Sequence, residues 1–140
     1  MNKLPFFYLH KKSSLINIPS PLLIMVHGYG SNEKDLFSFS RALPDELTII
    51  SIRGDINILG AGYAWYDISI DFNGNKTYDN KKAIESRDAV ANCIDKCVET
   101  FNTDKKNVTL MGFSQGSILI NAVALTYPEK VKNIISLSGA

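Results

Sequence analysis

A serine bounded by glycines gives the strongest chemical signal in the sequence. Gly112-Phe113-Ser114-Gln115-Gly116 matches the pattern Gly-x-Ser-x-Gly, and it lies between a short apolar run and a segment with helical spacing. A sharp turn from strand to helix would hold the serine above the carboxyl edge of a sheet in a strained backbone conformation. The motif therefore predicts a nucleophile for acyl transfer. Its alternative is a serine that merely caps a helix in a glycine-bounded turn.

A second glycine-rich turn predicts the oxyanion donors that would act with this nucleophile. The sequence His-Gly-Tyr-Gly at 27–30 directly follows the apolar run 22–26. Acyl transfer needs two backbone N–H groups that converge on the tetrahedral oxygen, one from the residue after the nucleophile and one from a loop after an adjacent strand. We expect these donors to be the amides of Gln115 and Tyr29. A dinucleotide-binding turn is the rival, but a third glycine is absent and Glu33 would repel a pyrophosphate.

The elements that must position these turns alternate along the chain. Apolar runs predict strands at 6–9, 15–18, 22–26, 47–52, 108–111 and 131–138. Apolar residues at spacings of three and four predict helices at 32–43, 81–101 and 114–127. Between them, 53–80 is expected to be a long loop excursion of the kind that usually carries function. The alternation predicts one domain over residues 1–140, with a mostly parallel sheet and helices on both faces.

Composition excludes several other classes of function. The formal net charge of the 140 residues is +1, so there is no surplus of basic groups to neutralise phosphates and we expect no nucleic acid partner. The longest aliphatic run, 22–26, is far shorter than the roughly 20 residues of a transmembrane helix. The apolar stretch 4–9 is too short for a secretory signal, so a cytoplasmic location is expected. Neither zinc-ligand spacing nor a complete calcium loop occurs, so we expect no metal.

Two residues of the excursion have more than one interpretation. Trp65, between Tyr63 and Tyr66, could form the wall of a substrate pocket or anchor a long loop in the core. Arg53 follows the strand predicted at 47–52 and could orient the excursion through backbone hydrogen bonds, a structural role that we favour over substrate contact.

Four motifs together resemble the phospholipase/carboxylesterase family of α/β hydrolases, to which carboxylesterases and acyl-protein thioesterases belong. They occur in the family's order, over a region from Leu22 to the last residue: His-Gly-Tyr-Gly with the following residues 31–36, Arg53-Gly54, Gly62-Tyr-Ala-Trp-Tyr66, and 112–116. The resemblance implies a serine esterase with a Ser, Asp, His triad and no cofactor. It implies small-molecule substrates, namely carboxylic esters, acyl thioesters or lysophospholipids.

The resemblance also assigns roles to residues of this sequence. Ser114 would be the nucleophile, the amides of Tyr29 and Gln115 the oxyanion donors, and the segment around Trp65 a wall of the acyl pocket. We call residues 27–30 the oxyanion loop and residues 112–116 the elbow. Their remaining residues with an expected role are His27, Gly28, Gly30, Gly112 and Gly116.

The triad is incomplete in these 140 residues. In this fold the catalytic Asp and His follow the serine in the chain, but after Ser114 the sequence has neither, and its only later acid is Glu129. The two histidines are His10 and His27. We therefore expect an α/β-hydrolase fold that lacks its last strands and helices, with Asp and His beyond Ala140, and a chain that alone is nearly inactive.

Three alternatives remain open for a chain without the triad. His27 could serve as the base, because it follows a strand beside the nucleophile. The base could be recruited from another chain. The protein could also be a non-catalytic module that binds acyl groups or proteins, with its last strand paired to a partner.

Overall fold

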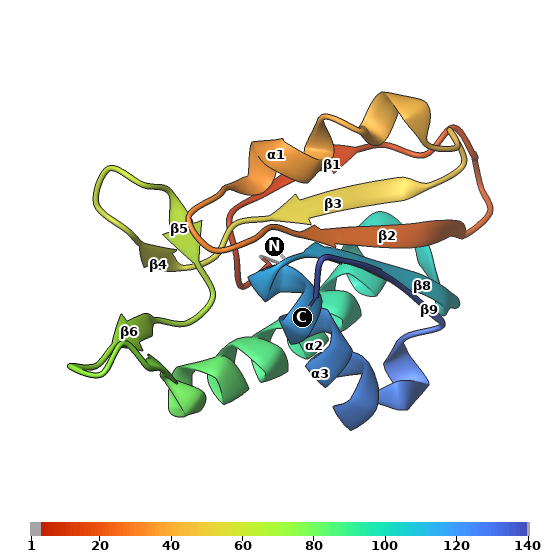
Figure 1. Ribbon diagram of the computed structural model, residues 1–140. Helices are drawn as coiled ribbons and strands as arrows, with labels where there is room; N and C mark the ends of the chain where they lie inside the picture. The colour runs from red at the N-terminus through yellow and green to blue at the C-terminus, as the bar shows by residue number, and fades with distance from the viewer. Residues whose placement is uncertain (1–3, 140) are drawn as a thin grey trace.

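The structure, a computed structural model, describes residues 4–139, and a five-stranded sheet forms its centre (Figure 1). The strand order is β1-β3-β2-β8-β9. β1 runs antiparallel to β3, and the other neighbours are parallel. The bounds of these strands are Tyr8–Lys11 for β1, Ser20–Val26 for β2, Thr48–Ile52 for β3, Thr103–Phe113 for β8 and Asn133–Leu137 for β9.

Helices cover both faces of this sheet, as predicted. α1 (Glu33–Phe37) and the short 3-10 turn η1 (Ser40–Ala42) lie on one face, whereas α2 (Asn80–Phe101) and α3 (Gln115–Thr126) lie on the other (Figure 1). Successive residues of a strand point to opposite faces, so β2 contributes to two separate cores. One core joins α1 to the sheet through Leu23, Met25, Leu36, Ile49 and Met111. The larger core includes Leu22, Ile24, Val26, Val90, Ile94, Leu110, Leu119 and Ile120.

Several predicted elements differ from those observed. No strand forms at 15–18, where Asn17 has a φ of +64° and Pro19 follows, because a left-handed residue and a proline interrupt an extended ladder. The helix expected at 32–43 ends at Phe37. The Ser38 hydroxyl donates to the Asp35 carbonyl at 2.7 Å and thereby competes with further helical bonds.

The excursion 53–80 is more ordered than expected. It forms two hairpins, β4 (Ile56–Asn57) with β5 (Tyr63–Ala64), and β6 (Ile68–Ile70) with β7 (Lys76–Tyr78). Both project from the end of the sheet at which β2, β3 and β8 finish (Figure 1). After α3, the turn η2 (Pro128–Lys130) leads into β9. No helix within residues 4–139 has the length and apolarity needed to cross a bilayer.

Two glycines let α3 lie so close to the sheet that no side chain would fit between them. A Cβ on Gly116 would collide with the carbonyl oxygens of Val26 and His27 at the end of β2. A Cβ on Gly112 would lie 2.6 Å from the carbonyl oxygen of Gly116. These obstacles are backbone atoms, which cannot rotate away. The spacing of the two glycines is therefore a steric requirement of the turn from β8 into α3.

The substitution Gly116→Ala tests this requirement. We expect it to lower the free energy of unfolding by about 2–4 kcal/mol, because the added methyl group must displace the end of β2 or the start of α3. Gly74→Ala is the matched control, since its Cβ meets no atom within 4 Å and only its left-handed φ of +79° is unfavourable, at about 1 kcal/mol. Urea unfolding measures both, and equal losses would contradict the steric explanation.

Candidate active site

Ser114 occupies a sharp turn between the last residue of β8 and the first residue of α3, as its motif predicted. Its φ of 54° and ψ of −117° are strained for a residue with a side chain, and such conformations cost of order 1–3 kcal/mol. The Ser114 amide donates to the Leu137 carbonyl at 2.9 Å, which ties the turn to β9. The hydroxyl makes no capping bond to α3. The interpretation of Ser114 as a simple cap therefore has no support in the geometry.

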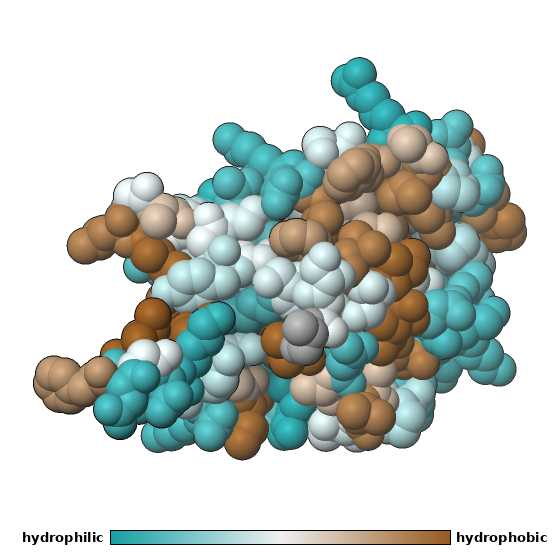
Figure 2. Space-filling view, in the orientation of Figure 1, coloured by the Kyte–Doolittle hydropathy of each residue, from teal (hydrophilic) through white to brown (hydrophobic). Residues whose placement is uncertain are grey.

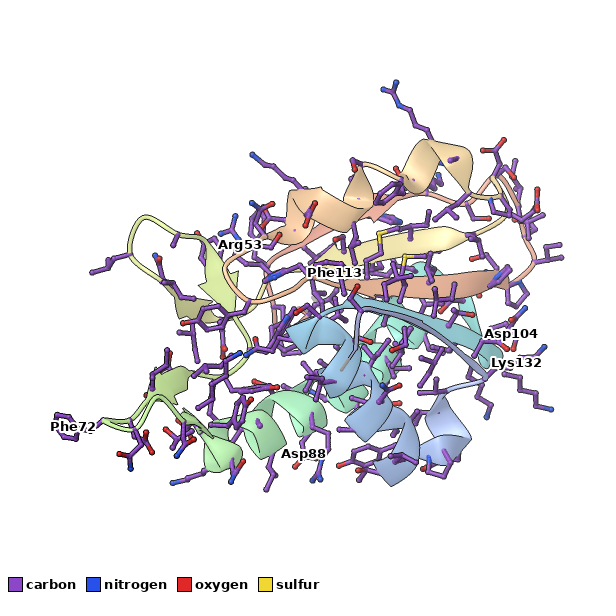
Figure 3. All side chains as sticks on the ribbon, in the orientation of Figure 1. Arg53, Phe72, Asp88, Asp104, Phe113 and Lys132 are labelled. Atoms are coloured by element: carbon purple, nitrogen blue, oxygen red, sulfur yellow. The ribbon has the colours of Figure 1, made fainter. Side chains whose placement is uncertain are left out.

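The loop 27–30 lies directly against this turn. Val26 is paired with Gly112 in the parallel register, so both chain segments leave the sheet at the same edge. A Cβ on Gly28 would lie 3.1 Å from the Phe113 carbonyl oxygen and 3.3 Å from the Ser114 Cβ. A side chain at residue 28 would therefore require its neighbours at the turn to shift by a few tenths of an ångström. Figure 3 labels Phe113, which precedes the serine at this edge.

The amides of Tyr29 and Gln115 remain without backbone acceptors in this arrangement. Next to Tyr29, the Gly30 amide donates to the Tyr63 carbonyl at 2.8 Å and the Ser31 amide to the Gly28 carbonyl at 3.1 Å, but within residues 4–139 the Tyr29 amide makes no such turn bond. Gln115 is the first residue of α3, where an N–H group has no intrahelical partner. Among the described residues, neither amide therefore has a backbone partner, and both can donate to an atom of a bound molecule.

His27 is a structural residue of the loop. Its side chain is buried, and its Nε2 accepts a hydrogen bond from the Gly54 amide at 2.9 Å. Its Nδ1 lies 2.7 Å from the Gly28 carbonyl oxygen, which can only accept, so Nδ1 carries the proton and the ring is neutral. Burial lowers the pKa of His27 below its usual value. Because both ring nitrogens are occupied, the hypothesis that His27 acts as the general base is wrong for this geometry.

The excursion clamps the loop to the elbow through Trp65 and Gln115. The Trp65 indole N–H donates to the His27 carbonyl at 2.8 Å, and its ring is entirely buried. The Gln115 side chain accepts from the Trp65 amide at 3.0 Å and donates to the Tyr66 carbonyl at 2.8 Å. Of the two interpretations of Trp65, burial favours the anchor, because an indole without exposed surface cannot touch a bound substrate. Sequence reasoning missed the side chain of Gln115.

Arg53 holds the base of the excursion, though not through backbone bonds as expected. Its guanidinium donates to both carboxylate oxygens of Glu33, at 2.8 and 2.9 Å. The same group lies over the rings of Phe7 and Tyr63, 4.2 and 4.4 Å from their centroids. The hydrogen bonds from Arg53 lower the pKa of the buried Glu33 carboxyl. The partner Glu33 was visible in the sequence only as a residue that would repel phosphate.

The remaining candidate bases lie away from Ser114. His10 is on β1, with its ring 4.4 Å from that of Phe101, and it lines a hollow with Ser20 and Thr48 at the amino ends of β2 and β3. This is the opposite end of the sheet from the elbow. Glu129 belongs to η2, beyond the far end of α3. Within residues 4–139, no group of three metal-ligating side chains is close enough to hold an ion.

An apolar cavity of about 530 Å³ lies between α2, α3 and β7. Ile118, one helical turn beyond Ser114, is part of its wall. Its other lining residues are Tyr66, Tyr78, Asn80, Ala83, Ile84, Arg87, Leu119 and Ala122. Tyr66 thus lines a cavity, whereas the neighbouring Trp65 does not.

The neutral state of His27 predicts a pH dependence of stability. Below pH 6.5, the usual pKa of histidine, His27 binds a proton in the unfolded chain but stays neutral in the folded protein. The free energy of unfolding therefore falls, by up to about 1.4 kcal/mol for each pH unit below this value. Above that pH this contribution is constant. We expect His27→Gln to flatten the slope between pH 6.5 and 5, as measured by urea unfolding. His10→Gln is the comparison: burial also lowers the pKa of His10, but this side chain is exposed whereas that of His27 is buried, so we expect a smaller flattening, and an equal one would contradict the assignment.

Comparison with known proteins agrees with the geometry. The model of the phospholipase/carboxylesterase family matches residues 14–140. MhqD of Bacillus subtilis, a hydrolase by name, is 23% identical over 128 residues, which are 91% of this chain and 60% of that protein. A carboxylesterase of Bacillus cereus superposes with a TM-score of 0.76 at 18% identity, over 93% of this chain and 58% of the other. A carboxylesterase of Mesorhizobium loti superposes with a TM-score of 0.68 at 22% identity, over 84% of this chain and 56% of the other.

These values also show how much of the relatives the chain represents. It spans about three fifths of the length of MhqD and of the Bacillus cereus carboxylesterase, 60% and 58% respectively. The fold is that of the carboxylesterase structures, and the resemblance inferred from the four motifs is confirmed. The chain belongs to the phospholipase/carboxylesterase family of α/β hydrolases.

Proposed function

We propose that this chain carries the nucleophile and the oxyanion site of a serine hydrolase acting on carboxylic esters. The observation that carries the proposal is the strained Ser114, whose hydroxyl is free of capping bonds and beside which the amides of Tyr29 and Gln115 have no backbone acceptor within residues 4–139. A hydroxyl that only stabilised the fold would need neither the strain nor the empty donors beside it.

The proposed reaction has two steps at Ser114. Its Oγ attacks the carbonyl carbon of the ester, a general base takes the hydroxyl proton, and the carbonyl oxygen becomes an oxyanion that accepts from the amides of Tyr29 and Gln115. Collapse of this intermediate breaks the bond to the leaving group, which departs with a proton as an alcohol or thiol. Water then attacks the acyl-serine, so that a carboxylic acid leaves and the hydroxyl is restored.

The general base belongs, in this proposal, to residues outside these 140. His27 uses both ring nitrogens in the loop, and His10 lies at the other end of the sheet. The chain spans about three fifths of the relatives it matches, with 60% of MhqD covered, which leaves room in them for further catalytic groups. The 140 residues alone would keep only the acceleration of an oxyanion site, of order 10³–10⁴ over water in triad-less serine proteases.

The apolar cavity supports an acyl group of hydrocarbon character. Ile118 in its wall is four residues beyond Ser114 on α3, so an acyl chain bound to the serine would have apolar surface within reach along the helix.

A second candidate, a non-catalytic acyl-binding or interaction module, is favoured by a different observation. The outer edge of β9 is unpaired among the described residues, and Ile135 and Leu137 on this strand are each 40% exposed. Such an edge is suited to pair with another strand. This alternative predicts binding without any acylation of Ser114.

Labelling with a fluorophosphonate, which forms a covalent bond to activated serines, tests the proposal. We expect slow labelling of Ser114 in the 140-residue chain, accelerated at least about tenfold by added imidazole, because free imidazole replaces the missing base. Mass spectrometry of tryptic peptides locates the adduct.

Matched variants make this experiment decisive. Ser114→Ala should abolish the imidazole-dependent labelling, whereas Ser69→Ala, at an exposed serine on β6, should leave its rate unchanged. Labelling that survives in Ser114→Ala, or that imidazole does not accelerate, would reject the nucleophile assignment and favour the binding module.

A further inference from the structure

A polar hollow lies at the amino ends of the sheet strands, at the opposite end from the elbow. Its volume is about 410 Å³, within the range of small-molecule sites. Ser20 and Thr48 are its buried lining residues and form its floor, and residues 12–18 form one wall. Figure 3 labels Asp104 at this end of β8 and Phe113 at the other. We call this cavity the amino-end hollow, and its lining residues are His10, Lys12, Ser13, Leu15, Ile16, Asn17, Ile18, Ser20, Thr48, Thr100, Phe101 and Asn102.

The floor of the amino-end hollow has more hydroxyl protons than acceptors for them. The Ser20 and Thr48 hydroxyls share one hydrogen bond of 2.6 Å, and within residues 4–139 neither makes a second, so one of their two protons is unused. Thr103, the register partner of Ser20, is 5% exposed, and its hydroxyl is the one buried side-chain group of the described chain without a partner. Proteins pair nearly all such groups, because an unpaired buried hydroxyl costs free energy. The floor therefore has donors for an acceptor from outside the chain.

The strand register places these groups under the end of α2. His10 is paired with Ile50 of the larger core. Thr48 is paired with Leu22 of the same core. Because paired residues point to the same face of a sheet, His10 and Thr48 share the face that α2 covers. The His10 ring lies 4.4 Å from that of Phe101, in the last turn of α2. The amino-end hollow thus lies between the sheet and the end of this helix.

Hydrogen bonds hold the segment 12–18 in place as a wall. The Ser13 hydroxyl donates to the Glu46 carbonyl at 2.6 Å. The Ser14 amide donates to the Asp45 carbonyl at 2.9 Å. This wall is therefore formed before any ligand binds, and a preformed site loses less conformational entropy on binding than a site that must first be ordered.

The amino-end hollow carries positive charge. No aspartate or glutamate is among its lining residues. Lys12 makes no ion pair within residues 4–139. Burial, and then the nearby Lys12 ammonium group, lower the pKa of His10, so His10 is neutral at pH 7. The carbonyl groups at the end of α2 contribute only about half an elementary negative charge. The charge therefore favours an anion over a cation.

The remaining walls are apolar, which favours an organic anion over an inorganic one. Leu15, Ile18 and Phe101 line the amino-end hollow together with its polar groups. Figure 2 shows brown apolar residues beside polar ones at the right-hand end of the molecule, where residues 12–18 turn. Ligand sites of this kind combine apolar walls, which bind the body of a ligand, with a few polar groups, which fix its orientation.

We propose that the amino-end hollow binds a small organic carboxylate, whose oxygens accept from the hydroxyls of the floor and whose charge is balanced by Lys12. The apolar body of this ligand lies against Phe101 and the segment 12–18. The site is at the opposite end of the sheet from Ser114, so the proposal does not depend on the proposed function.

Titration of the 140-residue chain with benzoate, followed by two-dimensional amide NMR spectra, tests this site. We expect saturable shifts of the Ser20, Thr48 and Thr103 amide signals, with a Kd of about 1 mM for a ligand of this size. Benzylamine, whose charge is positive, should bind at least about tenfold more weakly. Lys12→Gln should weaken benzoate binding at least about threefold, whereas Lys34→Gln, at an exposed lysine of α1, is the matched control and should not change it.

A double variant tests the floor. Ser20→Ala, Thr48→Val replaces both partners of a buried hydrogen bond by apolar groups of similar shape, so we expect it to fold. Its affinity for benzoate should fall at least about tenfold, because both hydroxyl donors are lost. Thr109→Val, at a threonine of β8 outside the amino-end hollow, should bind benzoate as the wild type does.

Several results would overturn the proposal. These are an absence of saturable shifts, equal binding of benzylamine, or unchanged affinity in either Lys12→Gln or the double variant. Shifts confined to the amides of residues 112–116 would place benzoate at the elbow and would also overturn it. Ser114→Ala should bind benzoate in the amino-end hollow normally, so rejection of the nucleophile assignment would leave this result intact.

Discussion

The contact between the first turn of α3 and the end of β2 is the constraint on which the site depends. Gly116 has no side chain, and so the backbone of α3 can rest against the carbonyl groups of Val26 and His27. That approach sets the path of the chain from β8 into the helix. Ser114 must therefore adopt its strained conformation at the edge of the sheet. The same contact brings the loop after β2 beside the serine, where Gly28 lets it pass.

The strain at Ser114 persists because buried polar groups fix its surroundings. A cost of order 1–3 kcal/mol is matched by a few hydrogen bonds that each contribute about 1 kcal/mol. Trp65 donates such a bond to the His27 carbonyl, the Gln115 side chain binds the backbone of Trp65 and Tyr66, and neutral His27 links the loop to Gly54. Because these groups are buried, leaving any one of them unpaired would cost more than the bond itself contributes. The excursion after β3 thus acts as a clamp on the loop 27–30.

The two ends of the sheet differ in character. At the amino ends of β2 and β3, Ser20 and Thr48 pair with each other through their hydroxyls, and His10 packs on Phe101. At the carboxyl ends, the amides of Tyr29 and Gln115 lie near the Ser114 hydroxyl, and within residues 4–139 these amides have no backbone acceptor and the hydroxyl makes no capping bond. The carboxyl edge of a parallel sheet collects loops from several strands, so distant parts of the chain contribute to one site there.

Local patterns of the sequence determined the elbow, the glycine-rich loop, the buried strands and the long helix α2. Each of these depends on residue types at fixed short spacings, which the printed sequence displays. Only the tertiary structure decided the state of His27, the burial of Trp65, the side-chain role of Gln115, and the partner of Arg53. Each of these depends on groups 20 to 50 residues away in the chain. Such pairings arise when strands and loops are brought together at one sheet edge, and no local spacing encodes them.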